Sequence, residues 1–498
     1  MPEIPATLPP ENKRSRLATL LRPKVAIPVF LLVLLLISPM IIRGWRLRDV
    51  PNVPEPFDPK PLLSLEIPDD ENAYTHYREA MELFHSPTDH VLNLIHGDFE
   101  TPDPRGILRE GWHLADDEVR QFLIDNQLAL KEWKKGTQQQ QALPFPVNEN
   151  DFSVDLDVDF TLSTLTLSAS LLARKLEAED NLSEAWEWYR AAIRSSRHCG
   201  TNGSLIERGL GASIFSEVSE QLDDWATNPR VSDELLKHAI RNLQTDWKLT
   251  AKSSTVFQVE YLMQMNSIEK AHSGVDGKSW EDYYVRNVPS NPFEMYLAGE
   301  PEFSFRLIRL EFYNRLLSCD LLPFERDPSL EDRYLIPTSV TAATAKPLSI
   351  SSAEFERLLY DSLIAKQTLP GLTQFQTKID IEEIRFRTLL TAIAGQAFYR
   401  DHGHFPEILD ELVPDYLDEA PIDIYDGKPL KYVHQPEGPV VYSVFENLRD
   451  DGGTDLKSRK GKYYTTIEPD DLGFQMRIPG IKPLRADKPF IVEDDDSE

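Results

Sequence analysis

The sequence predicts a mainly α-helical protein that ends in a small α+β module, and three observations lead to this fold class. One apolar run near the N-terminus is long enough to be a transmembrane helix. Helical hydrophobic periodicity then fills most of residues 69–375, and a long helix followed by short alternating segments occupies residues 376–470. Runs of helices followed by strands indicate an α domain and a separate α+β domain.

The predicted organisation has six parts. In chain order these are an N-terminal cytoplasmic segment (1–24), a transmembrane helix (25–42), a proline-rich linker (43–68), a helical domain (69–375), an α+β module (376–470) and an acidic tail (471–498). A chain of 498 residues with 41% hydrophobic residues is long enough to form more than one core.

Charge is distributed unevenly. The first fifty residues contain eight Lys/Arg and three Asp/Glu, whereas the remainder contains 45 basic and 79 acidic residues. A surface with this excess of negative charge repels phosphate backbones. We therefore expect no nucleic-acid partner.

The apolar run extends from Val25 to Ile42, eighteen residues without a charge. At 1.5 Å per residue it spans ~27 Å, close to the ~30 Å of a bilayer core. A cleaved signal peptide would have a shorter apolar core and small residues at its end, and the residues after Ile37 offer no such site. We predict an uncleaved anchor that contacts the lipid bilayer through residues 25–42, with Trp45 at the interface. The basic residues before it favour a cytoplasmic N-terminus.

The segment that follows the anchor is rich in proline. Residues 51–68 contain six prolines, a composition typical of an extended, semi-rigid spacer. We expect it to hold the rest of the chain away from the membrane. The two cysteines, Cys199 and Cys319, allow either a disulfide or two buried thiols.

Several elements are predicted between residues 69 and 375. A first helix follows Asn72, a second covers Ala115–Lys135, and strict alternation predicts a strand over Phe152–Leu162. A helical hairpin turns at residues 180–181, with Ser183 as its cap. Five further helices are expected at Ser204–Ala226, Ser232–Lys248, Ser254–His272, Phe303–Leu317 and Ala353–Ile364.

Two of these helices share one spacing of small and aromatic residues. The spacing A-x3-Y-x2-A occurs at Ala73, Tyr77 and Ala80, and again at Ala185, Tyr189 and Ala192. Small residues allow helices to approach closely, and this local pattern resembles the second helix of a tetratricopeptide repeat. The two copies are 112 residues apart, so the sequence does not predict a regular array. The resemblance implies a protein partner on the helical domain.

The C-terminal module begins with a long helix. Its apolar positions Phe386, Leu390, Ile393 and Ala397 form one stripe, and Gly403 marks its end. A short helix over residues 408–413 follows. Strands are predicted at Pro429–Val433, Val440–Val444 and Tyr463–Ile467.

This segment resembles the C-terminal domain of the major pseudopilin of type II secretion. The matching residues, in family order, are Tyr399, Asp401, Gly403, Phe405, Pro406, Leu409, Leu412, Tyr416, Leu417, Pro421, Asp423, Tyr425, Gly427, Pro429, Leu430, Tyr432, Tyr442, Ser443, Asn447, Asp450, Gly452 and Gly453. The match covers about 80 residues and implies a bacterial inner-membrane protein. In the family a leader ending in Gly precedes the apolar helix, whereas here Gly44 follows the apolar run and no Phe-Thr-Leu-x-Glu begins it. The run also lies more than 300 residues from the module. We therefore expect no assembly into a pilus.

The resemblance also implies a calcium site in the closing loop. Its candidate ligands are Asn447, Asp450, Asp451 and Asp455, because calcium takes six to eight oxygen ligands and the adjacent glycines allow a tight wrap. The alternative is a solvated Asp/Gly turn without a metal. Arg449, inside the loop, favours that alternative.

Known catalytic motifs are not found in the sequence. It has no G-x-S-x-G, H-E-x-x-H, P-loop or dinucleotide fingerprint. His402 and His404 flank a turn, where histidines usually lie at the surface. We predict a membrane-anchored, extracytoplasmic, non-enzymatic protein that binds or scaffolds a partner. The alternatives are an accessory component of a secretion or pilus-like system, and a hydrolase whose site the sequence does not reveal.

Overall fold

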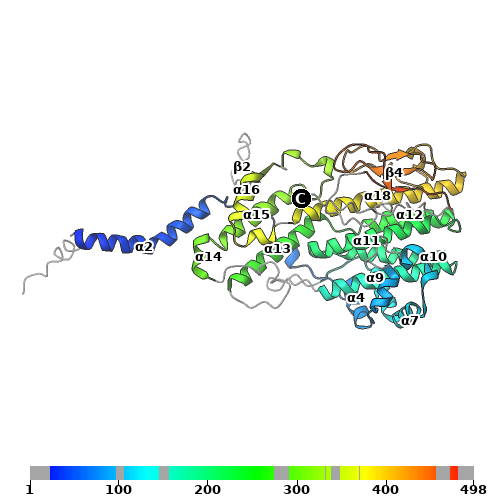
Figure 1. The fold of residues 1–498 in the computed structure, drawn as a ribbon, viewed down its shortest axis with the longest axis horizontal. Coiled ribbons are helices and arrows are strands. Elements are labelled where there is room, and N and C mark those ends of the chain that lie inside the picture. The colour runs from blue at the N-terminus through cyan, green and yellow to red at the C-terminus, as the bar shows by residue number, and fades with distance from the viewer. Residues whose placement is uncertain are drawn as a thin grey trace, which may run out of the picture.

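The computed structural model describes residues 23–96, 106–144, 156–273, 291–330, 332–337, 348–369, 371–455 and 471–479. Figure 1 shows an elongated, mainly helical body from one end of which helix α2 (Pro23–Arg48) projects. The C-terminal sheet lies against helix α18 (Leu372–His402) at the other end of the body. The predicted coarse fold class, mainly helical with one apolar N-terminal helix and a small C-terminal sheet, is confirmed.

The elements that follow α2 fall into three groups. The first contains α3 (Lys60–Leu63), α4 (Ala73–Glu82), α5 (Asp89–His96), α6 (Ile107–Glu110), η1 (Trp112–Leu114), α7 (Asp117–Asp125), α8 (Gln127–Thr137), α9 (Leu156–Ala178), α10 (Leu182–His198), α11 (Leu205–Ala226) and α12 (Asp233–Trp247). The second contains α13 (Ser253–Ser273), α14 (Pro292–Ala298), α15 (Glu302–Leu316), η3 (Pro323–Glu325), η4 (Pro328–Leu330), β1 (Arg333–Ile336), β2 (Leu348–Ser351), α16 (Ser352–Asp361) and α17 (Ala365–Thr368). The third contains α18, η5 (Leu409–Leu412), β3 (Lys431–Val433), β4 (Val440–Ser443), β5 (Thr454–Asp455) and β6 (Leu472–Gln475).

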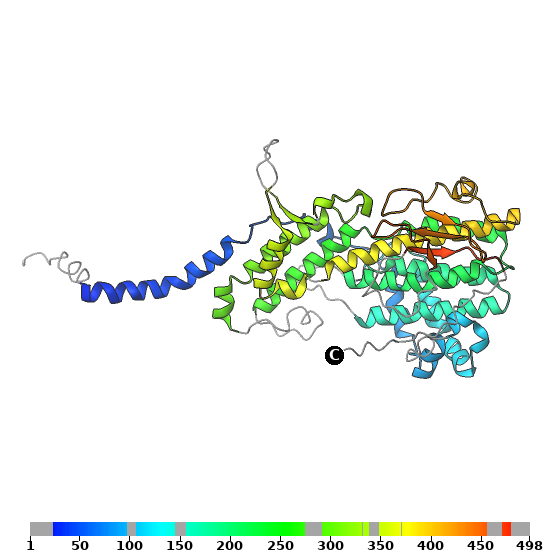
Figure 2. The same cartoon turned by 45° about the horizontal axis from the view of Figure 1, so that its top comes forward.

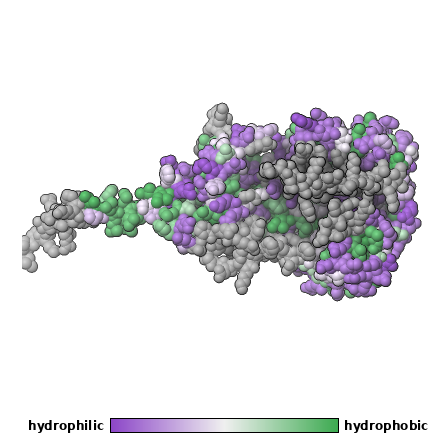
Figure 3. Space-filling model, viewed as in Figure 1, coloured by the Kyte–Doolittle hydropathy of each residue, from purple (hydrophilic) through white to green (hydrophobic). Residues whose placement is uncertain are grey.

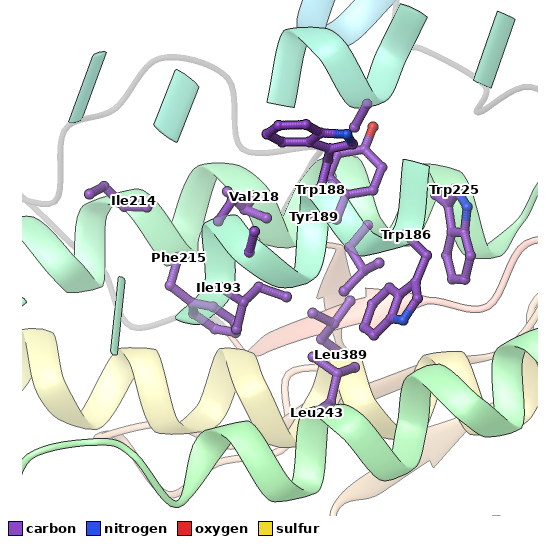
Figure 4. Close-up of a cluster of buried hydrophobic side chains, with 14 of the residues drawn as sticks. Trp186, Trp188, Tyr189, Ile193, Ile214, Phe215, Val218, Trp225, Leu243 and Leu389 are labelled. Atoms are coloured by element: carbon purple, nitrogen blue, oxygen red, sulfur yellow. The ribbon is translucent and has the colours of Figure 1, made fainter. Parts of the chain in front are cut away.

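A first hydrophobic core lies in the half of the body away from α2. It joins α4–α12 to most of α18 and to the C-terminal sheet. Figure 4 shows aromatic and aliphatic side chains from several helices meeting in this core, with Trp186 close to Trp225. These two indoles stack with their centroids 5.5 Å apart. Aromatic side chains bury the largest areas, so they contribute most of the hydrophobic stabilisation here.

A second core lies in the half nearer to α2. It is formed by α13–α17, and Val50 and Val53 from the segment after α2 pack into it. Leu372 at the start of α18 belongs to this core, whereas Ile381 and the apolar residues after it belong to the first core. Helix α18, which is 31 residues long, therefore runs through both cores and joins them. Figure 2, a view turned by 45°, shows α18 running along the body.

The C-terminal sheet has the strand order β3-β4-β6-β5. Strands β3, β4 and β6 are antiparallel, and the two-residue β5 pairs in parallel with β6. All four residues of the central strand β4 are buried. Helix α18 packs against the sheet, and the loop that carries Asp450 and Gly453 packs against Tyr442. A separate two-stranded ribbon, β1 with β2, lies beside the second core.

Most predicted helices are confirmed, but two local predictions are wrong. The strand predicted over Phe152–Leu162 is helical from Leu156, where α9 begins, and residues 152–155 lie outside the described residues. Leu162, Leu165 and Ala169 bury one helical face, and this packing outweighs the local alternation. The helix predicted over Ala115–Lys135 is two helices that break at Asn126.

The break at Asn126 and the hairpin cap both depend on backbone hydrogen bonds. The buried Asn126 side chain accepts a hydrogen bond from the His85 amide and donates to the His85 carbonyl. It thus fixes the junction of α7 and α8 against the end of α4. The α9–α10 hairpin turns at residues 180–181 as predicted, but its N-cap is Asn181 and not Ser183.

The cores do not follow the predicted domain boundaries. The predicted boundary at residue 375 falls inside α18, which supplies residues to both cores. The residues that follow the predicted boundary at 470 include β6, which pairs with β4. The domain boundaries themselves stay predictions. The third strand predicted at 463–467 lies outside the described residues.

The proline-rich segment is not a free spacer. Val53 is 1% exposed in the second core, and Phe57 makes an edge-to-face contact with Tyr261. Leu62 packs against α13. The prediction failed because proline stiffens a chain but does not prevent its apolar residues from being buried. Cys199 and Cys319 are buried thiols that no disulfide joins, which decides between the two alternatives.

Candidate functional site

The first candidate site is the junction between α2 and the body, here called the stem (residues 43–48). The Arg43 guanidinium donates to the carbonyls of Tyr296 and Glu300, each at 3.1 Å, and lies 4.9 Å from the centroid of the Tyr296 ring. Arg46 forms a 3.5 Å ion pair with Asp361. Two arginines thus attach the end of α2 to α14 and α16, so this helix and the body are joined without an intervening linker.

Above the stem, α2 is uncovered. Its large apolar side chains from Ile27 to Ile42 are 41–68% exposed, and they form the hydrophobic arm in Figure 3. Within the described residues, one segment, Phe30–Arg48, is long and apolar enough to cross a membrane. Both Pro28 and Pro39 lie within the helix.

Aromatic side chains gather where the apolar arm meets the body. Trp45 on the stem is 64% exposed, and Phe293 and Tyr296 on α14 are 58% and 38% exposed. Arg43 fixes α14 beside the last turn of the apolar segment through the Tyr296 carbonyl. Trp and Tyr are enriched at membrane–water interfaces, where an apolar ring with a polar group is stable.

The second candidate is the C-terminal loop, whose predicted ligands are engaged with the protein itself. The Asn447 amide donates to Asp451 at 2.8 Å, and its oxygen accepts from the Arg449 backbone. Asp450 accepts from the Tyr442 hydroxyl at 2.7 Å. The backbone of Asp455 pairs with β6, and its side chain lies outside the described part of the structure.

One acidic residue of this loop was missed by sequence reasoning. Asp471, assigned to the tail, is buried and accepts hydrogen bonds from the backbone amides of Asp451 and Gly453, at 2.7 and 2.9 Å. Burial raises the pKa of Asp471, and the nearby Asp450 and Asp451 carboxylates raise it further. The sequence does not show that Asp471 lies close in space to a loop that precedes it by about twenty residues.

These contacts test whether the loop fits a calcium ion. Calcium requires six to eight converging oxygens. The described residues bring carboxylate and amide donors to one loop, but Asn447, Asp450 and Asp451 are engaged in hydrogen bonds within the protein. Calcium binding would require these internal hydrogen bonds to open, and it stays a prediction from the family resemblance.

The residues that carry the family resemblance hold the module together. Asp423 is fully buried and accepts from the Ser443 hydroxyl at 2.7 Å and the Val444 amide at 2.8 Å. The Tyr432 hydroxyl donates to the Pro406 carbonyl at 2.8 Å. His402 stacks on Phe398 and His404 is exposed, so these two histidines do not converge on one point. The observed interactions of these residues are packing and hydrogen bonding.

A third candidate was not predicted. His76 and Glu79 on α4 and Glu132 on α8 each place one ligand atom within 4.8 Å of the others, and within the described ranges this is the one group of three such residues. The hydrogen bond from Lys135 holds the pKa of Glu132 below its ordinary value, and His76 contributes to this effect. The H-x-x-E spacing was a signal in the sequence, but the partner Glu132 is identified only by helix packing.

Buried ion pairs connect the helices around these sites. Arg477, two residues after β6, forms ion pairs with Asp223 at 2.5 Å and with Asp224 at 2.9 Å on α11. Asp224 also pairs with Arg174 on α9. The described start of the predicted tail is therefore fixed to the helical bundle by paired, hydrogen-bonded charges.

Together these features define a class: a mainly helical protein with one apolar N-terminal helix of membrane-spanning length and a small C-terminal sheet packed on a long helix. No family model, no curated protein and no solved structure matches the chain.

Proposed function

We propose that the chain is a single-pass membrane protein that holds a partner-binding scaffold at a fixed position on the bilayer surface. The observation that carries this proposal is the stem, where α2 continues from its exposed apolar segment directly into contacts with α14 and α16. A flexible tether would leave the body free to move. Contacts of Arg43 and Arg46, on successive turns of α2, restrict the motion of the body relative to this helix.

The aromatic residues at the stem support contact between the body and the lipid interface. Phe293 and Tyr296 lie on a helix that Arg43 holds at the end of the apolar segment. In this arrangement α14 reaches the headgroup region when α2 spans the bilayer. The body then contacts lipid at a second place besides its anchor.

The orientation follows from charge. Five basic residues, Lys13, Arg14, Arg16, Arg22 and Lys24, precede the apolar segment, which favours a cytoplasmic N-terminus. The acidic body is then extracytoplasmic, in a bacterial inner membrane if the pseudopilin resemblance holds. A reporter enzyme active only outside the cytoplasm, fused to the C-terminus, tests this orientation, and an inactive reporter on a stably inserted protein rejects it.

Partner binding is proposed from the tetratricopeptide-like helix pairs. Tyr77 and Tyr189, with their flanking alanines, are fully buried between helices, as such pairing requires. Site-specific photocrosslinking from Leu128 in the native membrane, with Leu35 in the anchor as the matched position, tests it. A product specific to Leu128 supports a partner, and identical products from both positions reject one.

Spin labels on the full-length protein in lipid vesicles test the membrane geometry. The native thiols are buried, so a new cysteine labels selectively. We expect a lipid-buried signal at Val33→Cys, a headgroup-depth signal at Phe293→Cys and an aqueous signal at Leu128→Cys, because Leu128 is exposed on α8. An aqueous signal from the label at residue 33 would contradict the membrane-spanning anchor. An aqueous signal at residue 293 together with a lipid-buried signal at residue 33 would contradict only the contact of α14 with the headgroup region.

A second candidate, an accessory of a secretion or pilus-like system, is favoured by the long α18 with a small antiparallel sheet packed on it. The apolar face of α18 is already covered by α11 and α12, which supports an accessory rather than a filament subunit. Specific co-purification with pseudopilins tests this candidate. Normal secretion in a deletion strain would contradict it.

A further inference from the structure

His76, Glu79 and Glu132 form a compact group between two helices that pack closely. His76 and Glu79 are three residues apart on α4, so they share a face, and Glu132 approaches from α8. The Nδ1 atom of His76 lies 2.8 Å from an oxygen of Glu132. Their side chains are 20% and 14% exposed, while Glu79 is exposed. The group is therefore partly enclosed and open on one side.

The backbones that carry these residues are fixed by the core. Tyr77 and Trp133, the neighbours of His76 and Glu132, are fully buried. Gly136 allows α8 to approach α4 so closely that a Cβ at this position would lie 2.6 Å from the Tyr77 ring. Side chains on such rigid elements hold their positions better than side chains on loops.

The surroundings of the group are those of a ligand site. The side-chain nitrogen of Gln139 lies 3.4 Å from His76 Nε2, the ring nitrogen that faces away from Glu132. A rotation of the Gln139 amide by about 180° would present its oxygen, which can accept from the Nε2–H of an imidazole whose Nδ1 binds a metal. Histidine ligands usually hydrogen-bond through their second nitrogen, which fixes the tautomer and the ring plane. Lys135, half exposed, lies 2.5 Å from the other oxygen of Glu132 and balances its charge.

We infer that His76, Glu79 and Glu132 form a binding site for a divalent transition metal of the zinc class, with Gln139 as the outer-shell partner of the histidine. One imidazole and two carboxylates suit zinc, at bond lengths of about 2.0–2.2 Å. Donors on such an ion are roughly 3–3.5 Å apart. The 2.8 Å separation between His76 and Glu132 therefore needs to open by about half an ångström, and Glu79, whose ligand atom lies within 4.8 Å of the other two, needs to close to the same range. The open side of the group leaves one position for water.

The nitrogen ligand distinguishes this site from a calcium or magnesium site, because those ions prefer oxygen. Binding replaces the hydrogen bond between His76 and Glu132 with bonds from both side chains to the metal. The ion joins α4 to α8. This inference depends neither on the membrane anchor nor on the proposed partner.

Cobalt(II), whose visible absorption reports its coordination, is the probe. The full-length protein, purified without a histidine tag and stripped with a chelator, is titrated with Co²⁺ and then with Zn²⁺ in competition. We expect one Co²⁺ per chain, displaced by Zn²⁺ and unaffected by excess Ca²⁺. Gln139→Ala should weaken binding by roughly tenfold, which is the effect of losing an outer-shell partner.

The ligand variants are Glu79→Gln, whose exposure makes misfolding no concern, and His76→Gln, each expected to lower cobalt affinity by about tenfold or more. The matched control is His90→Gln. His90 lies 2.8 Å from Asp116 and 3.9 Å from Glu118, but these three residues do not converge. Absence of cobalt binding, or binding that survives Glu79→Gln and His76→Gln, overturns the inference. Loss of binding in His90→Gln also overturns it.

Discussion

Glu382 on α18 forms a buried ion pair with Arg197 on α10, and its second oxygen accepts from Arg208 on α11. All three side chains are at most 4% exposed. Burial would raise the pKa of Glu382, but the two guanidinium groups outweigh it and lower the pKa to about 2. One carboxylate thus joins three helices of the first core.

Glu382→Gln should strongly destabilise the protein, because it leaves two buried guanidinium groups without a counter-charge. We expect a loss of about 3–5 kcal/mol in the free energy of unfolding, measured by urea denaturation near neutral pH. The control is Glu179→Gln, which removes a surface ion pair with Lys175 and should cost about 0–1 kcal/mol. Because the native pKa lies below the ordinary value of 4.5, the difference from wild type should shrink as the pH falls toward about 2. A pH-independent difference would contradict this assignment.

Glu207 should give the opposite pH dependence. It caps α11 from a buried position, and burial raises its pKa from 4.5 to about 7. Between pH 4.5 and about pH 7, Glu207 is ionised in the unfolded chain but still protonated in the native protein. The free energy of unfolding therefore falls as the pH rises, by about 3 kcal/mol for this residue. Glu207→Gln keeps an acceptor oxygen for Ser204 and should reduce the fall in melting temperature between about pH 5 and about pH 8. An unchanged pH profile would count against the raised pKa.

Gly136→Ala should test the close approach of α4 and α8. The added Cβ would lie 2.6 Å from the Tyr77 ring and 2.9 Å from the Ala73 carbonyl oxygen. Overpacking lowers the free energy of unfolding by about 1–3 kcal/mol. The better helix propensity of alanine offsets up to about 1 kcal/mol of this loss. Thermal unfolding should show the net loss. The control is Gly44→Ala in α2, where no atom lies within 4 Å of the added Cβ. This variant should show no loss of stability.

Calcium binding by Asn447, Asp450, Asp451 and Asp455 stays a prediction from the family resemblance. If the loop rearranges around the ion, millimolar calcium should raise the melting temperature, since a ligand at 100 times its Kd stabilises by about 2.7 kcal/mol. Asp451→Asn, which removes the negative charge and one of the two carboxylate oxygens but keeps an acceptor for the Asn447 amide, should abolish that rise. Differential scanning calorimetry measures both. An unchanged melting temperature leaves the loop as a hydrogen-bonded turn.

Local signals predicted most of the fold. The capping box of Ser204 and Glu207 and the left-handed Gly403 after α18 mark helix ends in the sequence and in the structure. The strand predicted over Phe152–Leu162 failed because alternation is a local pattern, whereas the burial of Leu162 and Leu165 depends on neighbouring helices. Candidate ligands were predicted in the loop, where acidic residues are adjacent in sequence.

The sequence by itself determined where the chain is apolar enough to span a membrane, where most helices begin and end, and that a small sheet follows the last long helix. These properties depend on composition and on spacing within a few turns. Only the tertiary structure decided that α18 runs through both cores, that Asp471 and Arg477 are fixed to the folded body, and that Glu132 meets His76. Such contacts join residues 20 to 254 positions apart, and no local periodicity determines which distant side chains meet.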